Sequence, residues 1–160
     1  MDEYQHLKRL DRIWVSNPIV FITTCTHKRK SFLAESQIAR ILVDEWLMTK
    51  ERHGWIVDRY VIMPDHVHFF CGPVLGEPIK SLSDFMKQWK QWTSKRICRE
   101  CNQRGQPYLP PIWQAEFFDH VLRSEESYSQ KWDYVRQNPI RAGLSPTADE
   151  WLWQGEIYQL

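Results

Sequence analysis

The stretch Trp55-Ile-Val-Asp-Arg-Tyr-Val-Ile-Met-Pro-Asp-His-Val-His-Phe-Phe-Cys71 decides the fold, because it predicts two strands joined by a turn. Trp55 to Met63 is rich in β-branched and aromatic residues, which favour strands. Met63-Pro64-Asp65 predicts a turn, and His66 to Cys71 predicts the next strand. Apolar residues lie on both faces of this second strand, as is typical of a central strand covered on both sides.

The flanking sequence predicts one sheet combined with helices. Ser36 and Ser124 are the predicted N-caps of two helices, and Gly54 is a predicted C-cap. The other expected elements are a strand over 19–26, helices over 36–52 and 79–101, a loop over 102–111, a strand over 117–122 and a helix that ends at the Asn138-Pro139 pair. This order suits an α+β sandwich of the ferredoxin-like (RRM-like) type, an antiparallel sheet with helices packed on one face.

The length and composition predict a single domain without a membrane anchor. The chain has 160 residues and a formal net charge of +1, which argues neither for nor against a nucleic-acid partner. We expect one unit over 1–144 and a C-terminal tail over 145–160, which folds back onto the sheet or over the functional site. No apolar stretch approaches 18 residues, and the four cysteines lack the spacing of a secreted disulfide framework. These features predict a cytoplasmic protein.

His66-Val67-His68 is the sharpest local motif. Alternate side chains of a strand share a face, so the two imidazoles point the same way with Cβ atoms about 7 Å apart. They could bind one divalent ion and leave positions open for substrate, with Asp65 as a supporting or outer ligand. Two histidines that merely fill a half-buried strand are the alternative. An apolar strand makes unpaired imidazoles costly, which favours a metal site.

The last helix carries a tyrosine on its polar side. Tyr134 lies one turn from Lys131 and one turn from Asn138, and away from the apolar stripe of Tyr128, Trp132 and Val135. A phenol in this place could attack phosphorus, with Lys131 favouring the phenolate and the amide oxygen of Asn138 serving as a third metal ligand. Alternatively, Tyr134 packs against another element and Asn138 caps the helix.

Three blocks of the sequence resemble the REP-associated tyrosine transposases of bacteria, which are members of the HUH single-tyrosine transposases. The blocks are Tyr60–Phe70 with its His-hydrophobic-His motif, Trp113–Arg123, and Asp133–Gly143. The resemblance spans roughly residues 17–144 and implies the ferredoxin-like fold reached above. It also implies that His66 and His68 bind the metal, that Tyr134 is the nucleophile and that Asn138 is a third polar ligand. His120 matches a recurring histidine of the family to which no role is assigned.

The resemblance further implies an activity and its partners. Such enzymes use Mg²⁺ or Mn²⁺ to cleave and rejoin single-stranded DNA through a 5′-phosphotyrosine intermediate that frees a 3′-hydroxyl. Their substrates are repetitive extragenic palindromes folded as hairpins beside a short guide sequence, so we expect a transposase associated with the nucleoid. It would act as a monomer, as REP-associated members can, or as a homodimer, as insertion-sequence relatives do.

Basic residues on several predicted elements are candidates for phosphate contacts, and a solvated surface is the alternative for each of them. The candidates are Lys28, Arg29, Lys90, Lys131, Arg136 and Arg141. Two other functions remain open on the residues alone. One is a catalytically silent module that binds single-stranded nucleic acid. The other is a metal-dependent phosphohydrolase that uses His66 and His68 with an activated water.

Overall fold

The computed structural model describes residues 19–74, 80–103, 105 and 108–158. The expected start of the second long helix, at residue 79, lies outside this part of the chain, as do residues 104, 106 and 107 of the expected loop over 102–111. Within it, one antiparallel sheet has the strand order β4-β1-β3-β2-β5. The strands are β1 (Ile19–Cys25), β2 (Trp55–Ile62), β3 (His66–Pro73), β4 (Phe118–Leu122) and β5 (Gln154–Glu156). The predicted pair over 55–71 is confirmed as β2 and β3, and β3 is central.

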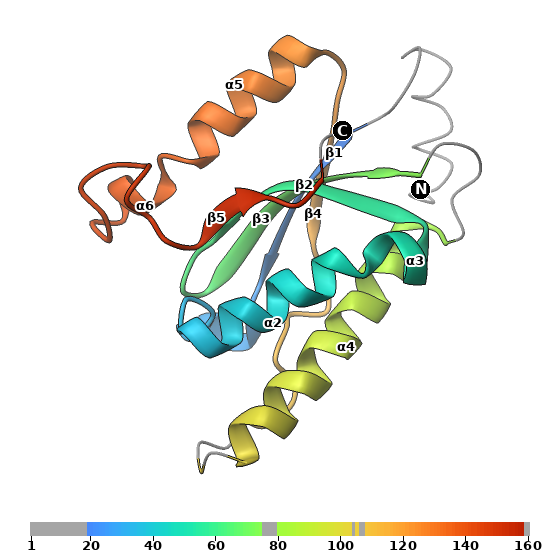
Figure 1. The fold of residues 1–160 in the computed structure, drawn as a ribbon, viewed down its shortest axis with the longest axis vertical. Coiled ribbons are helices and arrows are strands. Elements are labelled where there is room, and N and C mark those ends of the chain that lie inside the picture. The colour runs from blue at the N-terminus through green and yellow to red at the C-terminus, as the bar shows by residue number, and fades with distance from the viewer. Residues whose placement is uncertain (1–18, 75–79, 104, 106–107, 159–160) are drawn as a thin grey trace.

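Helices α2 (Ser36–Leu47) and α4 (Leu82–Gln103) cover one face of this sheet, with the short α3 (Thr49–His53) beside them (Figure 1). Their apolar sides meet β3 through stacked aromatic rings. Trp46 of α2 lies parallel to Trp89 of α4 at 5.5 Å between ring centroids, and both rings contact Phe69 of β3. Because the side chains on this face of β3 are fully buried, the opposite face is held on a rigid support.

Helix α5 (Glu125–Val135) lies on the opposite face of the sheet, followed by the short α6 (Asn138–Arg141) (Figure 1). The expectation of helices on one face therefore holds for α2 and α4 and is wrong for α5. The reason is that Phe70 of β3 points to this side, where it packs against Tyr128 at 4.5 Å between ring centroids and against Trp132. The predicted apolar stripe of α5 is confirmed by these contacts.

Several helix boundaries differ from those expected. The helix predicted over 36–52 is broken at Met48, where the Thr49 hydroxyl donates to the Trp46 carbonyl and competes with the helical pattern. Ser36 is the first residue of α2, and its N-cap is Glu35. Gly54 is confirmed as a C-cap, with φ of 75°.

The start of α5 is as predicted, and its end is not. The Ser124 hydroxyl accepts a hydrogen bond from the Ser127 backbone N–H and so caps the helix. Helix α5 ends at Val135, and the Asn138-Pro139 pair begins α6, because proline is tolerated in the first turn of a helix.

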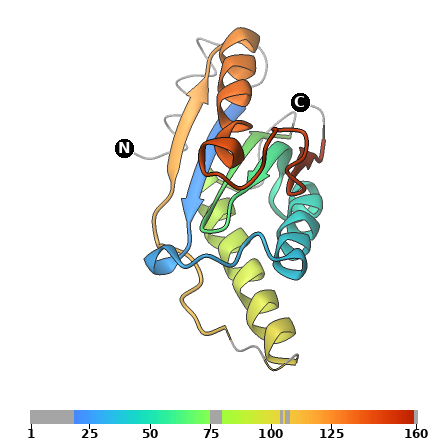
Figure 2. The ribbon, with the colours of Figure 1, turned by 90° about the vertical axis from the view of Figure 1, so that its left-hand side faces the viewer.

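The tail folds back onto the sheet. β5 pairs with β2, and the Trp151 indole N–H donates to the Ile62 carbonyl. Gly155 lies directly over Tyr60, where an added Cβ would come within 3.0 Å of the phenol oxygen, so a larger residue would push the strand away. β4 closes the other edge beside β1, as Figure 2 shows. None of the described helices is both long enough and apolar enough to cross a membrane.

Candidate active site

The two histidines of β3 project from the sheet face that carries α5. Their ring centroids are 4.8 Å apart, with the rings nearly perpendicular. Antiparallel pairing places Thr23 of β1 opposite His68 and Cys25 opposite His66. Since directly paired residues share a face, these four side chains form one row at the end of the β1–β3 ladder.

His68 is held at both ring nitrogens. Its Nδ1 lies 2.7 Å from the hydroxyl oxygen of Thr23, and its Nε2 lies 2.8 Å from the side-chain nitrogen of Asn138. An amide nitrogen can only donate, so Nε2 carries the lone pair, and Nδ1 carries the proton and donates it to Thr23. Phe21 stacks on the ring at 5.4 Å between centroids.

The charge state of His68 suits a metal ligand. Burial, together with the nearby His66, Lys131 and Arg141, lowers its pKa to about 3. The imidazole is therefore neutral throughout the physiological range, and its Nε2 lone pair, which accepts from the Asn138 side-chain nitrogen, could bind a metal once that side chain turns away.

His66 is oriented by a carboxylate. Its Nδ1 lies 2.7 Å from one oxygen of Asp65, and the other oxygen of Asp65 accepts a hydrogen bond from Arg29 Nε at 2.9 Å. Burial alone would raise the pKa of Asp65, but the hydrogen bonds from Arg29 and His66 outweigh it and lower the pKa. A charged carboxylate bound to Nδ1 leaves Nε2 for a metal, which is the usual arrangement around a ligating histidine.

Asn138, the first residue of α6, reaches this row from beyond the far end of α5, the helix that carries Tyr134. The Tyr134 side chain is 63% exposed, so it does not serve as a packing residue. Arg141 donates to the Tyr134 carbonyl at 2.8 Å, and its guanidinium lies 4.2 Å from the centre of the phenol ring. Arg141 also donates to the Asn138 side-chain oxygen. A chain of contacts thus runs from Tyr134 through Arg141 and Asn138 to His68.

His120 lies near Tyr134 as well. A hollow of about 310 Å³ is lined by His120 of β4 and by Lys131 and Tyr134 of α5. His120 is paired with Phe21 of β1 and therefore faces the same side of the sheet as His68. The ammonium of Lys131 lies 5.1 Å from the centre of the Phe21 ring, so this cation lies between the hollow and the histidines.

The donor atoms at this site suit a divalent ion. Two imidazole nitrogens are available from His66 and His68, and the Asn138 amide lies against His68. Imidazole binds transition metals well, and amide oxygens suit Mg²⁺ and Mn²⁺. In the part of the chain that the structure describes, no three His, Cys, Asp or Glu side chains form a group able to hold a metal ion. The Asn138 amide presents its nitrogen to His68 and its oxygen to Arg141, so it would have to rotate to offer that oxygen to a metal.

The predicted DNA contacts are brought to the site only in part. Arg29, Lys131 and Arg141 each raise the positive potential at His68, which appears in its lowered pKa. Lys28 adjoins Arg29 in an exposed turn in which both residues have a positive φ. Arg136 forms an ion pair with Asp149, outside this group.

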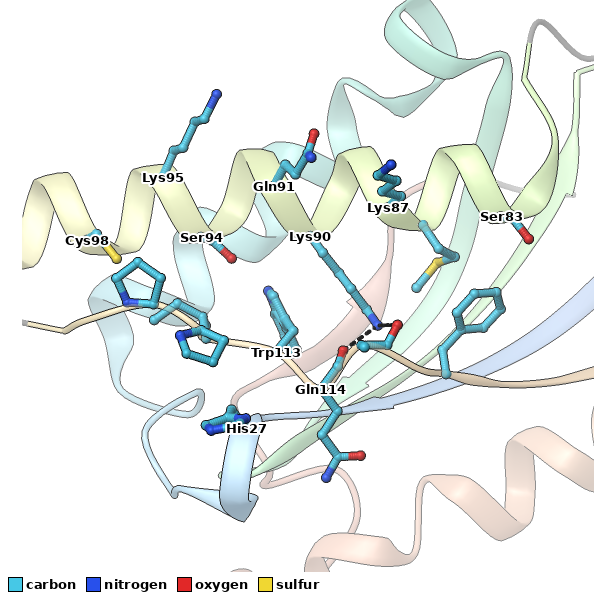
Figure 3. A pocket seen from close by; sticks show the side chains of 16 residues that line it. His27, Ser83, Lys87, Lys90, Gln91, Ser94, Lys95, Cys98, Trp113 and Gln114 are labelled. Atoms are coloured by element: carbon cyan, nitrogen blue, oxygen red, sulfur yellow. Dashed lines mark hydrogen bonds between the residues drawn. The ribbon is translucent and has the colours of Figure 1, made fainter.

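Lys90 has a structural role. Its ammonium donates to the backbone carbonyl of Gln114 at 2.8 Å (Figure 3) and to that of Glu116 at 2.9 Å, and so joins α4 to the facing loop. Burial lowers its pKa to about 8. The carbonyls already bind this ammonium, and a contact between Lys90 and DNA stays a prediction.

Sequence reasoning missed Thr23, although it contacts a proposed metal ligand directly. Its position follows from the register between β1 and β3, which pairs residues 45 positions apart. No local pattern around Thr23 reports that register. The alternation of side chains in β1 shows only that Thr23 shares a face with Phe21.

Comparisons with known proteins point to one family. A family model described as "Transposase IS200 like" matches residues 15–138. The REP-associated tyrosine transposase of Escherichia coli K12 is 24% identical over 151 residues, which cover 94% of this chain and 80% of that protein. A putative REP-associated tyrosine transposase of Haemophilus influenzae is 26% identical over 92 residues, covering 56% of this chain and 52% of that protein.

Solved structures share the fold. A REP-associated tyrosine transposase bound to a REP hairpin superposes with a TM-score of 0.68 at 19% identity, covering 92% of this chain and 91% of that one. A putative transposase from Deinococcus radiodurans superposes with a TM-score of 0.53 at 22% identity, covering 78% of this chain and 92% of that one. The segment matched by the family model contains both histidines, Tyr134 and Asn138. The chain therefore belongs to the family of IS200-like transposases.

Proposed function

We propose that this protein is a metal-dependent transposase that cleaves and rejoins single-stranded DNA at REP-type hairpins, with Tyr134 as the nucleophile. The observation that carries the proposal is the chain of contacts from an exposed tyrosine, through Arg141 and Asn138, to a neutral His68. The names of the relatives, and the hairpin bound in one solved structure, support REP-type hairpins as the substrate. Action on such DNA would place the protein in the cytoplasm, at the nucleoid.

The reaction exchanges one phosphodiester for another. The Tyr134 phenol oxygen bonds to phosphorus as the bond from phosphorus to the 3′ oxygen breaks, and the phenol proton is lost to water. The departing 3′ oxygen takes a proton and leaves as a hydroxyl, while the 5′ phosphate stays on Tyr134. Because the number of phosphate ester bonds is unchanged, a 3′-hydroxyl can attack the phosphotyrosine and rejoin the DNA without an external energy source.

His66, His68 and Asn138 are the residues that would hold Mg²⁺ or Mn²⁺. A divalent ion bound there would withdraw charge from the scissile phosphate and so favour attack. Asp65 and Thr23 orient the two imidazoles through their Nδ1 atoms. Holding the ligands in place before substrate arrives lowers the cost of reaching the reactive geometry.

Arg29, Lys131 and Arg141 supply the positive charge around the site. A phosphodiester approaching Tyr134 meets Arg141 beside the phenol ring and Lys131 in the adjoining hollow. Such contacts would bind the backbone irrespective of sequence and would weaken as salt is raised.

A covalent adduct tests the proposal. The protein is incubated with Mn²⁺ and a fluorescent pool of hairpin oligonucleotides carrying random single-stranded flanks, then run on a denaturing gel. The wild type should carry DNA, and Tyr134→Phe should not. The matched control is Tyr108→Phe, since Tyr108 donates to Glu35 away from the site and its loss should leave the adduct intact.

The alternatives give different results. Tight hairpin binding without cleavage by the wild type would identify a silent binding module. Cleavage that requires metal, shows no adduct and survives Tyr134→Phe would identify a phosphohydrolase that uses activated water. Either result would refute the role given to Tyr134.

A further inference from the structure

A large groove lies away from the tyrosine, between α4 and the segment 110–117 (Figure 3). Its volume is about 1170 Å³, and its lining is mostly apolar. Met86, Ile112 and Phe117 are among the apolar residues that line it, and Met86 and Ile112 are buried. The groove exceeds the usual size of a small-molecule pocket and is open to solvent, which suits a polymer.

The charged side chains that line this groove are all basic. Lys87 and Lys95 lie at its rim on α4 and are exposed, two helical turns or about 12 Å apart. The third, Lys90, is tied to the carbonyls of the facing segment and holds the far wall in place. No carboxylate is among the described lining residues. The side chains of Gln91 and Gln114 supply neutral hydrogen-bonding groups on opposite walls.

The groove adjoins the candidate active site through the end of β1. The 3-10 turn η1 (His27–Arg29) contributes His27 to the lining of the groove, and Arg29 to the contacts with Asp65 and His66. The segment 110–117 is also hydrogen-bonded to η1, since the His27 backbone N–H donates to the Ile112 carbonyl at 2.9 Å. One turn of chain therefore borders both regions.

We propose that this groove binds the single-stranded DNA that adjoins the scissile phosphate, so that one strand runs from Tyr134 past η1 and along α4. The inference rests on the proposed function. Lys87 and Lys95 would bind phosphates, the apolar lining would contact the faces of bases, and Gln91 and Gln114 would bond to base edges. Continuity with the cations at the site favours nucleic acid over an acidic peptide, because a single polyanion can use both sets of charges.

Binding measured by fluorescence anisotropy tests this inference. The probes are a hairpin with a random single-stranded flank of about ten nucleotides, a typical length for a single-strand binding site, and the same hairpin without a flank. Flanks on the 5′ and 3′ sides are compared. The variant combines Lys87→Glu with Lys95→Glu, and its matched control is Lys50→Glu, an exposed lysine on α3 outside the groove.

The wild type should bind one of the flanked probes about tenfold more tightly than the bare hairpin. The double variant should lose this advantage and still bind the bare hairpin normally. Its plot of log affinity against log salt should be less steep by about 1.4, since each phosphate contact on a single strand contributes about 0.7. Lys50→Glu should match the wild type. With 5-iodouracil in the flank, photocrosslinks should map to residues 110–117.

Three results would overturn the inference. In the first, the double variant binds the flanked probe like the wild type, with the same salt dependence. In the second, it loses affinity equally for both probes, so that the lysines contact the hairpin itself. In the third, the flank has no effect and a peptide of alternating Glu and Leu residues occupies the groove, which would identify a protein partner. The double variant should still form the Tyr134 adduct at saturating DNA, because only binding of the flank is lost. If the proposed function itself is wrong, the wild type forms no such adduct.

Discussion

Replacing Thr23 with valine tests whether His68 is held ready for a metal. Valine keeps the branched shape of threonine and removes the hydroxyl, whose oxygen lies 2.7 Å from His68 Nδ1. That oxygen accepts the hydrogen bond from the Nδ1 proton, which lies there because the Asn138 side-chain nitrogen donates to Nε2. In Thr23→Val, the buried Nδ1–H of His68 would have no acceptor, and the ring would lose its preferred orientation.

The expected magnitudes follow from these two losses. A hydrogen-bond partner that orients a ligating histidine typically contributes 10- to 100-fold to metal affinity, which corresponds to about 1.4–2.7 kcal/mol. A buried donor left without a partner costs about 1–3 kcal/mol of folding free energy. We therefore expect Thr23→Val to bind Mn²⁺ 10- to 100-fold more weakly and to unfold at lower urea concentration.

The assays are calorimetric titration with Mn²⁺ alone and equilibrium unfolding in urea. Thr24→Val is the matched control, because Thr24 is the next residue of β1, is 1% exposed and faces the opposite side of the sheet. It should leave the Mn²⁺ affinity unchanged. Wild-type affinity in Thr23→Val, or an equal loss in both variants, would refute the role given to Thr23. Absence of Mn²⁺ binding by the wild type would refute the ligand set itself.

Two predictions concern the stability of the fold. Trp46→Ala should lower the free energy of unfolding by about 3–5 kcal/mol, measured in urea, because it removes a fully buried ring stacked on Trp89. His53 is 2% exposed, and its pKa is lowered to about 4 by burial and by the nearby cations Lys80 and Arg52. Its unfolded pKa is about 6.5, so the stability it contributes is present above that pH and is lost as pH falls toward 4. Between pH 7.5 and 5.0 the loss should be about 2 kcal/mol, and His53→Gln should show a correspondingly smaller decrease; an equal decrease in both proteins would contradict the assignment.

Much of the fold can be predicted from local patterns. The strand pair over 55–71 and the stripe of α5 depend on the period of apolar residues, and such periods are visible in any one segment. The face of the sheet that α5 covers cannot be predicted in this way. It depends on whether Phe70 or Phe69 meets the helix, and both are large apolar residues in one buried strand. A strand that is apolar on both faces cannot indicate which helix lies on which side.

The candidate site shows the same division. Alternation within β3 places His66 and His68 together, whereas the predicted helical spacing from Tyr134 to Asn138 is interrupted, because α5 ends at Val135 and Asn138 begins α6. The contacts between these elements depend on strand register and on the turn after α5, which join residues far apart in sequence. Lys90 is an example: on an amphipathic helix its charge suggests a phosphate contact, and only the folded structure shows that the loop 24 residues away brings carbonyl oxygens to the ammonium.

Whether the site forms within one chain or between two can be argued from α6. Only two residues separate α5 from α6, and Asn138 at the start of α6 contacts His68 of the same chain. Arg141 binds both Asn138 and the Tyr134 carbonyl, so exchanging α5 with a second copy would break these contacts or rebuild them across an interface. We therefore expect a site in cis. Tyr134→Phe and His66→Ala, co-expressed and assayed together for the DNA adduct, should remain inactive, whereas wild type co-expressed with Tyr134→Phe should stay active. Recovery of adduct in the mixture of the two inactive variants would show that the nucleophile of one subunit serves the histidines of another.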